Sequence, residues 1–313
     1  VVEIALNQYA NVVAERRLAL IDRNKDLYIM PISPLPGLAR GKHKLHTQVD
    51  SIEWNDSSDM LVAVADGKVV TWYYPNVVYV DRGLLALTSS SREATELGKL
   101  PAINTFFGDR VTVRKADGTV IHINVPSYPL MLYEYVYSGK WEAAVRLCRF
   151  IQSDEMWGCL AAMALHGFNL ETAEIALAAV KEVDKLQYIL YIKDIPSQEG
   201  RNAEMMLYKR CPDEAENILL QASPPLTYRA IKLNIRLYRW NRALELAVKY
   251  RSHVDTVLGY RQRFLETFKK QETDAQFLQY KDKVTIDWDA IKAKKEKEKE
   301  EEMERANRGG GYK

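Results

Sequence analysis

The stretch NTFFGDRVTVRKADGTVIHINVPSYPLMLYEYVYSGKWEAAVRLCRF, residues 104–150, contains a change of hydrophobic period near Val125. Before Val125, apolar side chains alternate in short runs broken by Asp-Gly pairs, which is typical of half-buried strands joined by tight turns. After it, apolar side chains recur every three or four residues in blocks of helix length. The stretch therefore predicts a β region that ends where a helical region begins.

Three segments before Val125 resemble one another: residues 16–32, 51–75 and 104–126. Each contains an apolar strand, a polar turn and a second strand, and the last two carry a further strand in front. Their turns contain Asp66-Gly67 and Asp117-Gly118. Asp-Gly tolerates positive φ and therefore suits a tight hairpin. The offset between matching strands, roughly 43 and then roughly 50 residues, is that of propeller blades with four short strands.

The strand in DGKVVTWYYP, residues 66–75, is apolar on both faces, as expected for a sheet packed between two neighbours. It resembles a WD repeat in which the Trp-Asp pair has become Trp72-Tyr73. Propellers close with about four to eight blades, whereas this region holds about three. We therefore expect residues 1–126 to form C-terminal blades of a WD-repeat β-propeller, with the missing blades in a longer protein or supplied from elsewhere. A small β-sandwich is the alternative.

Four helix pairs follow, at residues 128–150, 155–180, 201–222 and 227–250. Their breaks are predicted at Ser138-Gly139, Gly167 and Cys211-Pro212. A small residue early in each second helix would let two helices approach closely, and aromatic residues before three of these positions would fill gaps between repeats. The small residues are Ala144, Ala173, Ala215 and Ala243, and the aromatic residues are Trp141, Phe168 and Trp240. The spacing brackets the tetratricopeptide repeat of about 34 residues, so residues 127–285 predict a tetratricopeptide-like α-solenoid.

The pattern weakens towards the C-terminal end. Residues 258–281 continue as helix, and residues 291–308 read IKAKKEKEKEEEMERANR. The charges at i,i+4 spacing in that run are partly favourable and partly repulsive. We expect residues 286–313 to be a charged Lys/Glu tail, a solvated helix that frays towards Gly309-Gly310-Gly311. Contact of its lysines with an acidic surface or a partner helix is the alternative.

Composition limits the function. A formal net charge of +2 over 313 residues provides no global field that would favour nucleic acid or an anionic membrane. The chain has three cysteines, Cys148, Cys159 and Cys211, without CxxC spacing, which predicts reduced, buried thiols. Asn55-Asp56-Ser57 matches a glycosylation sequon, a use that the cysteines argue against. The longest apolar runs are shorter than the ~20 residues that span a bilayer.

The motifs of common enzymes, GxSxG, HExxH and GxGxxG, are absent from the sequence. Residues 37–43 (GLARGKH) approximate a phosphate-binding loop but are one residue short. His43 and His46 could share a metal, but a surface loop is the better interpretation. Asp81, Asp109 and Asp117 stand where turns favour Asp for backbone reasons. We therefore expect no catalytic residue, no cofactor-binding residue, no metal ligand and no cofactor, hence a protein that is not an enzyme.

Residues 90–150 and 157–180 closely resemble the family of the eighty-kilodalton WD-repeat subunit of intraflagellar transport complex B, and the likeness extends through the Lys/Glu tail. The resemblance implies two WD propellers followed by a tetratricopeptide-like solenoid, with this chain corresponding to the end of the second propeller and the solenoid. It implies no catalytic residues.

The same resemblance implies other subunits of that complex as partners. A calponin-homology-domain subunit would bind through the first propeller, which this chain lacks, and peripheral subunits would bind through the solenoid. Self-association as a homodimer is a further expectation; nucleic-acid binding and membrane insertion are not expected. The expected localisation is the ciliary axoneme, the basal body and the cytoplasm.

The leading hypothesis is a non-enzymatic scaffold subunit that supports the assembly and maintenance of cilia through protein–protein docking. Its repeat surfaces would offer many weak contacts that add through effective concentration. The alternatives are a propeller–solenoid scaffold of a vesicle coat and, from another class, a propeller enzyme with its site in a central channel.

Overall fold

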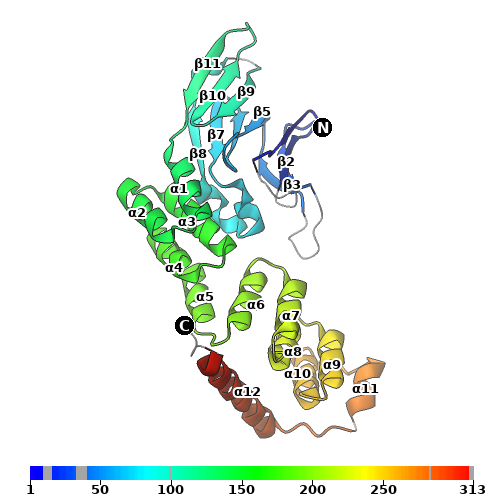
Figure 1. Ribbon diagram of the computed structural model, residues 1–313. Coiled ribbons are helices and arrows are strands. Elements are labelled where there is room, and N and C mark those ends of the chain that lie inside the picture. The colour runs from blue at the N-terminus through cyan, green and yellow to red at the C-terminus, as the bar shows by residue number, and fades with distance from the viewer. Residues whose placement is uncertain (10–15, 33–40, 99, 282, 310–313) are drawn as a thin grey trace. The chain divides into compact units, whose positions relative to one another are not determined.

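The structure of the protein is a computed structural model that describes residues 1–9, 16–32, 41–98, 100–281 and 283–309 (Figure 1). The chain forms two compact units. Unit 1 comprises Val1–Tyr191 with Tyr208–Arg210, and unit 2 comprises Ile192–Leu207 with Cys211–Lys313.

Unit 1 begins with three antiparallel sheets, whose orders are β1-β2-β3-β4, β5-β6-β7-β8 and β11-β10-β9. The strands of the first sheet are β1 (Glu3–Leu6), β2 (Arg17–Ile21), β3 (Leu27–Pro31) and β4 (His43–His46). Those of the second are β5 (Val49–Trp54), β6 (Leu61–Ala65), β7 (Lys68–Trp72) and β8 (Ser89–Glu93). Those of the third are β9 (Ala102–Phe107), β10 (Arg110–Arg114) and β11 (Val120–Asn124). The three predicted repeats therefore each correspond to one sheet.

The first strands of the three sheets are joined by hydrogen bonds that start at Glu3. Its carboxylate accepts from the Ser51 hydroxyl at 3.0 Å and from the Ile52 amide at 3.1 Å. The Ser51 hydroxyl in turn accepts from the backbone amide of Ile103 at 3.0 Å. Separate antiparallel sheets that are linked through their first strands are blades of a partial propeller, so the expectation of about three blades is confirmed over the sandwich alternative.

The two Asp-Gly turns differ in shape. Asp66 and Gly67 both have positive φ, 47° and 71°, so this pair forms the tight hairpin turn that its sequence predicts. At the second turn only Gly118 has positive φ, at 84°, and the Lys115 amide donates to the Thr119 carbonyl at 2.8 Å across a wider loop. The Asp117 carboxylate accepts from the Thr119 amide at 2.9 Å, which stabilises that wider form.

Short 3-10 helices and five α-helices complete the described part of unit 1. The former are η2 (Pro75–Tyr79), η3 (Arg82–Thr88) and η4 (Thr95–Leu97). The latter are α1 (Tyr128–Tyr137), α2 (Trp141–Ile151), α3 (Asp154–His166), α4 (Leu170–Ala179) and α5 (Val183–Lys193), whose last residues enter unit 2. The α-helices follow the sheets in Figure 1.

Helix α3 packs closely on η3, which lies between β7 and β8. A Cβ atom placed on Gly158 would lie 2.5 Å from the Leu87 carbonyl oxygen, so only glycine permits this approach. A second link comes from Tyr133 on α1, whose hydroxyl donates to the Tyr73 carbonyl at 2.7 Å. The first helices are thereby fixed to the second sheet.

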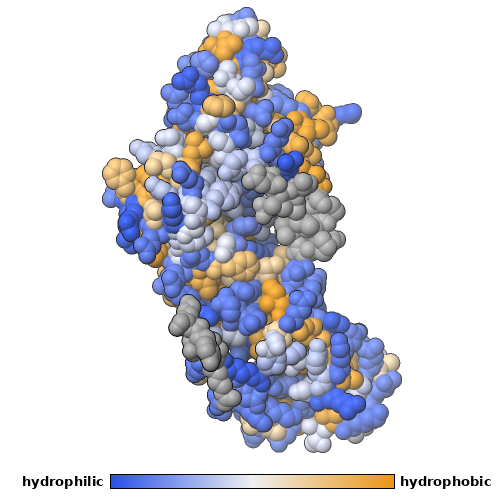
Figure 2. All heavy atoms as spheres, in the orientation of Figure 1, coloured by the Kyte–Doolittle hydropathy of each residue, from blue (hydrophilic) through white to orange (hydrophobic). Residues whose placement is uncertain are grey.

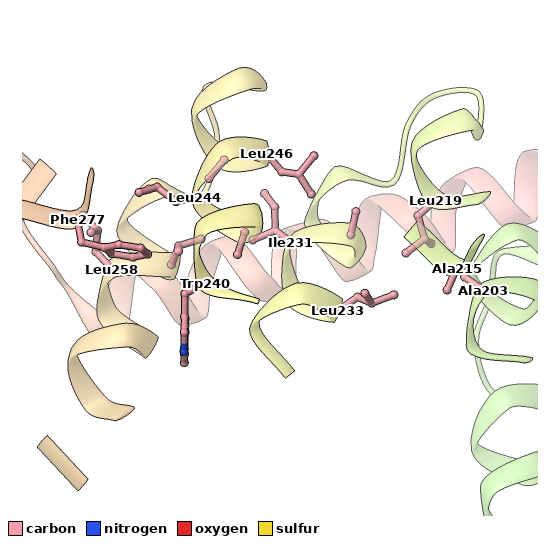
Figure 3. Packing of buried hydrophobic residues seen from close by; sticks show 14 residues of the cluster. Ala203, Ala215, Leu219, Ile231, Leu233, Trp240, Leu244, Leu246, Leu258 and Phe277 are labelled. Atoms are coloured by element: carbon pink, nitrogen blue, oxygen red, sulfur yellow. The ribbon is translucent and has the colours of Figure 1, made fainter. Parts of the chain in front are cut away.

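Unit 2 is helical in the part that the structure describes. Its helices are α6 (Gln198–Tyr208), α7 (Pro212–Gln221), α8 (Thr227–Arg236), α9 (Trp240–Lys249), α10 (Val254–Thr267), α11 (Ala275–Lys281) and α12 (Trp288–Gly309). Its core is a continuous row of apolar side chains that crosses these helices from Ala203 to Phe277 (Figure 3).

All four predicted helix pairs are confirmed, and their turns share one backbone form. In each turn one residue has positive φ, and the next residue donates its amide to a carbonyl five positions earlier, as in a Schellman motif. The positive-φ residues are Gly139, Phe168, Arg210 and Tyr238, with φ of 70°, 60°, 62° and 57°. The hydrogen bonds are Lys140 to Tyr135, Asn169 to Ala164, Cys211 to Met206 and Arg239 to Asn234, at 2.8, 2.9, 2.9 and 2.9 Å.

The predicted small positions are also confirmed, because Ala144, Ala173, Ala215 and Ala243 are each 0% exposed. The predicted gap-filling aromatics lie against later repeats. A Cβ on Gly167 would meet the Trp141 ring at 3.3 Å, and the Lys209 amine lies 4.1 Å from the centroid of the Phe168 ring.

Three expectations for the helices need correction. The predicted helix pairs do not include α5, which lies between the small residues Ala173 and Ala215 and lengthens the spacing between them. Residues 258–281 are two helices, α10 and α11, rather than one continuous helix. The tail helix α12 is solvated on most of its surface, but one face is docked, because Ile291 and Glu302 are only 4% and 6% exposed. Lys294, Glu298 and Glu302 on this helix pair with residues elsewhere in unit 2.

An ion pair joins α10 to the segment before α11. Arg261 donates from Nε and Nη2 to the two carboxylate oxygens of Glu272 at 2.8 and 3.1 Å. The same carboxylate accepts from the backbone amides of Thr273 and Asp274. The Arg261 hydrogen bond holds the pKa of Glu272 below its ordinary value of 4.5. The break between the two helices is therefore an ordered turn.

Replacing Trp240 tests the core of unit 2. This side chain is 9% exposed and packs on the Phe264 ring with centroids 5.3 Å apart. Trp240→Ala should lower the free energy of unfolding by about 3–5 kcal/mol, measured by urea titration with far-UV circular dichroism. The neighbouring Tyr238→Ala is the control, because Tyr238 is 64% exposed and should cost far less. Equal losses would contradict the assigned burial.

Gly158→Ala tests the approach of α3 to η3. Alanine is intrinsically better in a helix by about 1 kcal/mol, yet its methyl group would meet a backbone oxygen that cannot rotate away. Because overpacking costs about 1–3 kcal/mol, we expect a net loss of thermal stability in unit 1. A higher melting temperature for the variant would mean that the two helices are not in contact.

Glu272→Gln tests the turn before α11. We expect a loss of about 1.5–3 kcal/mol at pH 7, because glutamine lacks the charge that pairs with Arg261 and presents an NH2 donor where Glu272 accepts hydrogen bonds. Since the folded pKa lies below the unfolded one, the carboxylate's contribution is complete above pH 4.5 and disappears as pH falls through the folded value. Urea titrations of both proteins should therefore differ at neutral pH and converge in acid; a pH-independent difference would rule out the charged pair as its source.

Candidate interaction surfaces

The two histidines considered as metal ligands serve in packing. They lie in strand β4, not in the surface loop that the sequence suggested. The His43 ring meets the Tyr79 ring edge-on with centroids 5.0 Å apart, and the His46 ring lies 6.0 Å from the Trp72 ring. Among the residues that the structure describes, no three His, Cys, Asp or Glu side chains are grouped to hold a metal. Of the phosphate-loop candidate at 37–43, residues 37–40 lie outside the described residues.

The aspartates act mainly on the backbone, as predicted. Asp81 caps η3 by accepting from the Gly83 amide at 2.8 Å, and its other oxygen accepts from the Tyr208 hydroxyl at 2.5 Å. Asp109 lies in the turn before β10, where its carbonyl accepts from the Val125 amide at 2.7 Å. The link between Asp81 and Tyr208 was not foreseen, because nothing local in the sequence relates residues so far apart.

The sequon asparagine is a structural residue. Asn55 is 1% exposed, donates to the Gly108 carbonyl at 2.8 Å and accepts from the Ser57 and Ser58 hydroxyls at 3.0 Å. It thus links the second sheet to the third, and its amide nitrogen is not accessible for glycosylation in the folded protein.

Burial disfavours the charged forms of two cysteines and one aspartate of unit 1. The three cysteines are free and buried, as predicted. Burial raises the pKa of the Cys148 thiol to about 12 and that of Cys159 well above its ordinary value. Burial also raises the pKa of Asp59, whose carboxylate contacts the Asn7 amide and accepts from the Tyr137 hydroxyl at 3.0 Å. Through these contacts Asp59 joins the segment after β1 and helix α1 to the loop between β5 and β6.

A cavity of about 620 Å³ opens between α7, α9 and α10. Its lining residues are Asp213, Glu216, Asn217, Tyr238, Arg239, Trp240, Asn241, Arg242 and Arg261. The charged side chains on its wall are paired: Arg239 with Asp213 at 2.5 Å, Arg242 with Glu216 at 2.6 Å, and Arg261 with Glu272. Arginine side chains beside Tyr and Trp rings match the residue types that are enriched in protein interfaces.

Glu216 is the most constrained of these wall residues. It is 5% exposed, and its second carboxylate oxygen accepts from the Asn234 amide at 2.6 Å. Beside it, an aromatic rim continues the cavity, formed by exposed Tyr238 and Phe268 with half-buried Phe264 between them, at ring-centroid distances of 5.2 and 4.8 Å.

Two further surfaces lie on the sheets. The outer face of β1 exposes Val2, Ile4 and Leu6, at 67%, 59% and 38%, and hydrophobic atoms gather beside the N-terminus in Figure 2. The outer edge of β11 has no strand partner among the described residues, so the third sheet has three strands where the other two have four. Such a face and such an edge are surfaces on which further β structure can pack.

Helix α12 contacts α8 and α10 of unit 2, and α8 carries a row of three basic residues: Arg229, Lys232 and Arg236. Arg229 donates to both oxygens of Glu302 at 2.8 and 2.7 Å, and the Ser197 hydroxyl contacts the same carboxylate. Arg236 pairs with Glu204 at 2.8 Å. On α10, Asp255 binds Lys294, and buried His253 lies 3.1 Å from Glu298. The spacing i, i+3, i+7 of the basic row was readable in the sequence but was not singled out.

None of the described helices combines the length and the apolar character that a bilayer crossing requires.

Comparisons with known protein families match both the sheet region and the helical region of the chain. A family model for the IFT80 second beta-propeller matches residues 1–128, and one for the IFT80/172/WDR35/WDR19 TPR domain matches residues 156–304.

Curated relatives extend the match along the chain. The intraflagellar transport protein 80 homologs of Mus musculus and Rattus norvegicus are each 49% identical to it over 307 residues, which is 98% of this chain. The chain spans 39% of the length of these relatives. With both family models matching in the order that the fold requires, the chain belongs to the intraflagellar transport protein 80 family.

Proposed function

We propose that the protein is a non-enzymatic scaffold subunit of intraflagellar transport complex B, needed for the assembly and maintenance of cilia. The observation that carries this proposal is the 49% identity to intraflagellar transport protein 80 homologs over 98% of the chain. Identity that extends through sheets and helices alike supports a shared role of the whole architecture, not of a single module.

The surfaces described above support docking as the mechanism. The cavity in unit 2 has paired charges and an aromatic rim, and the cysteines of the chain are buried with two thiol pKa values raised. These features favour contacts between proteins over covalent chemistry. The names of the relatives favour ciliary transport over a vesicle coat.

The proposal assigns roles to three modules: propeller blades at residues 1–126, solenoid at 127–285 and charged helical tail at 286–313. Peripheral subunits of the complex bind through the solenoid, and a calponin-homology-domain subunit binds through a first propeller outside this chain. Self-association as a homodimer belongs to the same proposal, as does residence at the axoneme, the basal body and in the cytoplasm.

Affinity purification of the tagged full-length protein from ciliated cells tests this function. We expect the other subunits of the complex to co-purify, and fluorescence of the tag to mark the ciliary base and axoneme. Trp240→Ala should reduce the recovered subunits by weakening the solenoid core, with recovery normalised to the abundance of the tagged variant in the lysate. Recovery of vesicle-coat proteins, with the tag on Golgi or endosomal puncta, would contradict the proposal.

A further inference from the structure

The cavity between α7, α9 and α10 has an inner wall whose polar groups are already bonded. Glu216 accepts from Arg242 through one carboxylate oxygen and from Asn234 through the other. Arg261 donates to both carboxylate oxygens of Glu272. These bonds fix the shape of the wall before anything binds there, which lowers the entropic cost of binding.

The groups at the opening retain hydrogen-bonding capacity. The side chain of Arg239 is 37% exposed and donates from Nη1 to Asp213; in the part of the chain that the structure describes, its Nε and Nη2 make no hydrogen bond. The exposed side-chain amides of Asn217 on α7 and Asn241 on α9 likewise make none within the described ranges. The opening therefore offers a guanidinium edge and two amides to a ligand.

The charges at the opening favour an acidic ligand. The cavity is lined by three arginines and two carboxylates, but one of these carboxylates, Glu216, is 5% exposed and bonded through both oxygens. Asp213 is the lining carboxylate that meets solvent. Lys269 and Lys270 follow Phe268 of the rim as exposed amines, and no ion pair joins either to a carboxylate among the residues described. An acidic group is therefore attracted to this surface.

Aromatic side chains lie beside the charged opening. Tyr238 and Phe268 are 64% and 58% exposed and flank Phe264, and the Trp240 ring lines the cavity next to them. Large apolar side chains that are exposed as a group mark places where another molecule packs. A ligand that fits therefore carries a large apolar side chain next to its acidic one.

We propose that this cavity and its rim bind an extended segment of a partner protein in which an acidic residue adjoins a large apolar residue. The carboxylate binds Arg239, and the apolar side chain packs on Tyr238 and Phe268. The amides of Asn217 and Asn241 bond to the backbone of the segment, which must be extended because a helix satisfies its own backbone groups. This site deepens the docking role proposed above by naming the chemistry of a partner. Its tests use the purified chain alone, so their failure leaves the scaffold role standing.

The indole N–H signal of Trp240 reports whether the cavity is occupied. The probe is N-acetyl-phenylalanyl-aspartyl-N-methylamide, added to the whole chain with isotope-labelled tryptophan and followed by NMR. We expect the Trp240 signal, assigned by its loss in Trp240→Phe, to shift progressively and to saturate at millimolar probe and low salt. The asparaginyl analogue of the probe should bind about tenfold more weakly, because it lacks the charge that Arg239 attracts.

Two matched arginine variants separate this site from general electrostatic attraction. Arg239→Gln should weaken binding of the acidic probe about tenfold. Arg305→Gln should leave binding unchanged, since Arg305 is an ion-paired arginine of similar side-chain exposure, 44% against 37%, that lies on α12 outside the lining. Tyr238→Ala removes an exposed ring and should weaken both probes by a similar factor.

The proposal is overturned if the Trp240 signal does not move up to the solubility limit of the probe, or if the acidic and asparaginyl probes bind equally well. An equal shift with inorganic phosphate alone would mark a general anion site and would exclude the peptide. A change of the signal on concentrating the chain without probe would assign the surface to a second copy of the chain instead.

Discussion

The close approach of α3 to η3 is the constraint on which unit 1 depends. Because η3 is inserted between two strands of the second sheet, the blade itself supplies the platform on which the helices begin, and Gly158 is the residue that lets them reach it. The hydrogen bond from Tyr133 to Tyr73 fixes the first helix to the same sheet. Secondary structure therefore changes near Val125, while the compact unit continues to Tyr191.

Local signals account for the parts of the fold that the sequence predicted. The hairpin at Asp66-Gly67 follows from two residues that accept positive φ, and the helix pairs follow from apolar periodicity with a break after each first helix. Only one of the four helix turns has glycine at its positive-φ position. Phe168, Arg210 and Tyr238 adopt the same backbone form in the other three turns under tertiary packing, so glycine alone does not predict these turns.

Other features have no apolar period to reveal them. Strand β8 reads SSSRE, and the docked face of α12 alternates a single isoleucine with charges, so periodicity cannot distinguish either from a solvated segment. Their partners lie far away in sequence: β8 pairs with β7 across η2 and η3, and Glu302 pairs with Arg229. The interaction surfaces share this property, because the cavity and the contacts of α12 each involve several helices. Sequence reasoning could name the class of protein but not these surfaces.

Helical hairpins that resemble one another can stack in the wrong order, and the buried carboxylate of Glu216 makes such a misassembled stack less stable. Glu216, on α7, can bind Arg242 on α9 and Asn234 on α8 only when these three helices are neighbours. In a misassembled stack the same carboxylate would be enclosed without a counter-charge, at a cost of several kcal/mol. We infer that this polar contact favours the native adjacency of the third and fourth hairpins over other pairings of similar repeats.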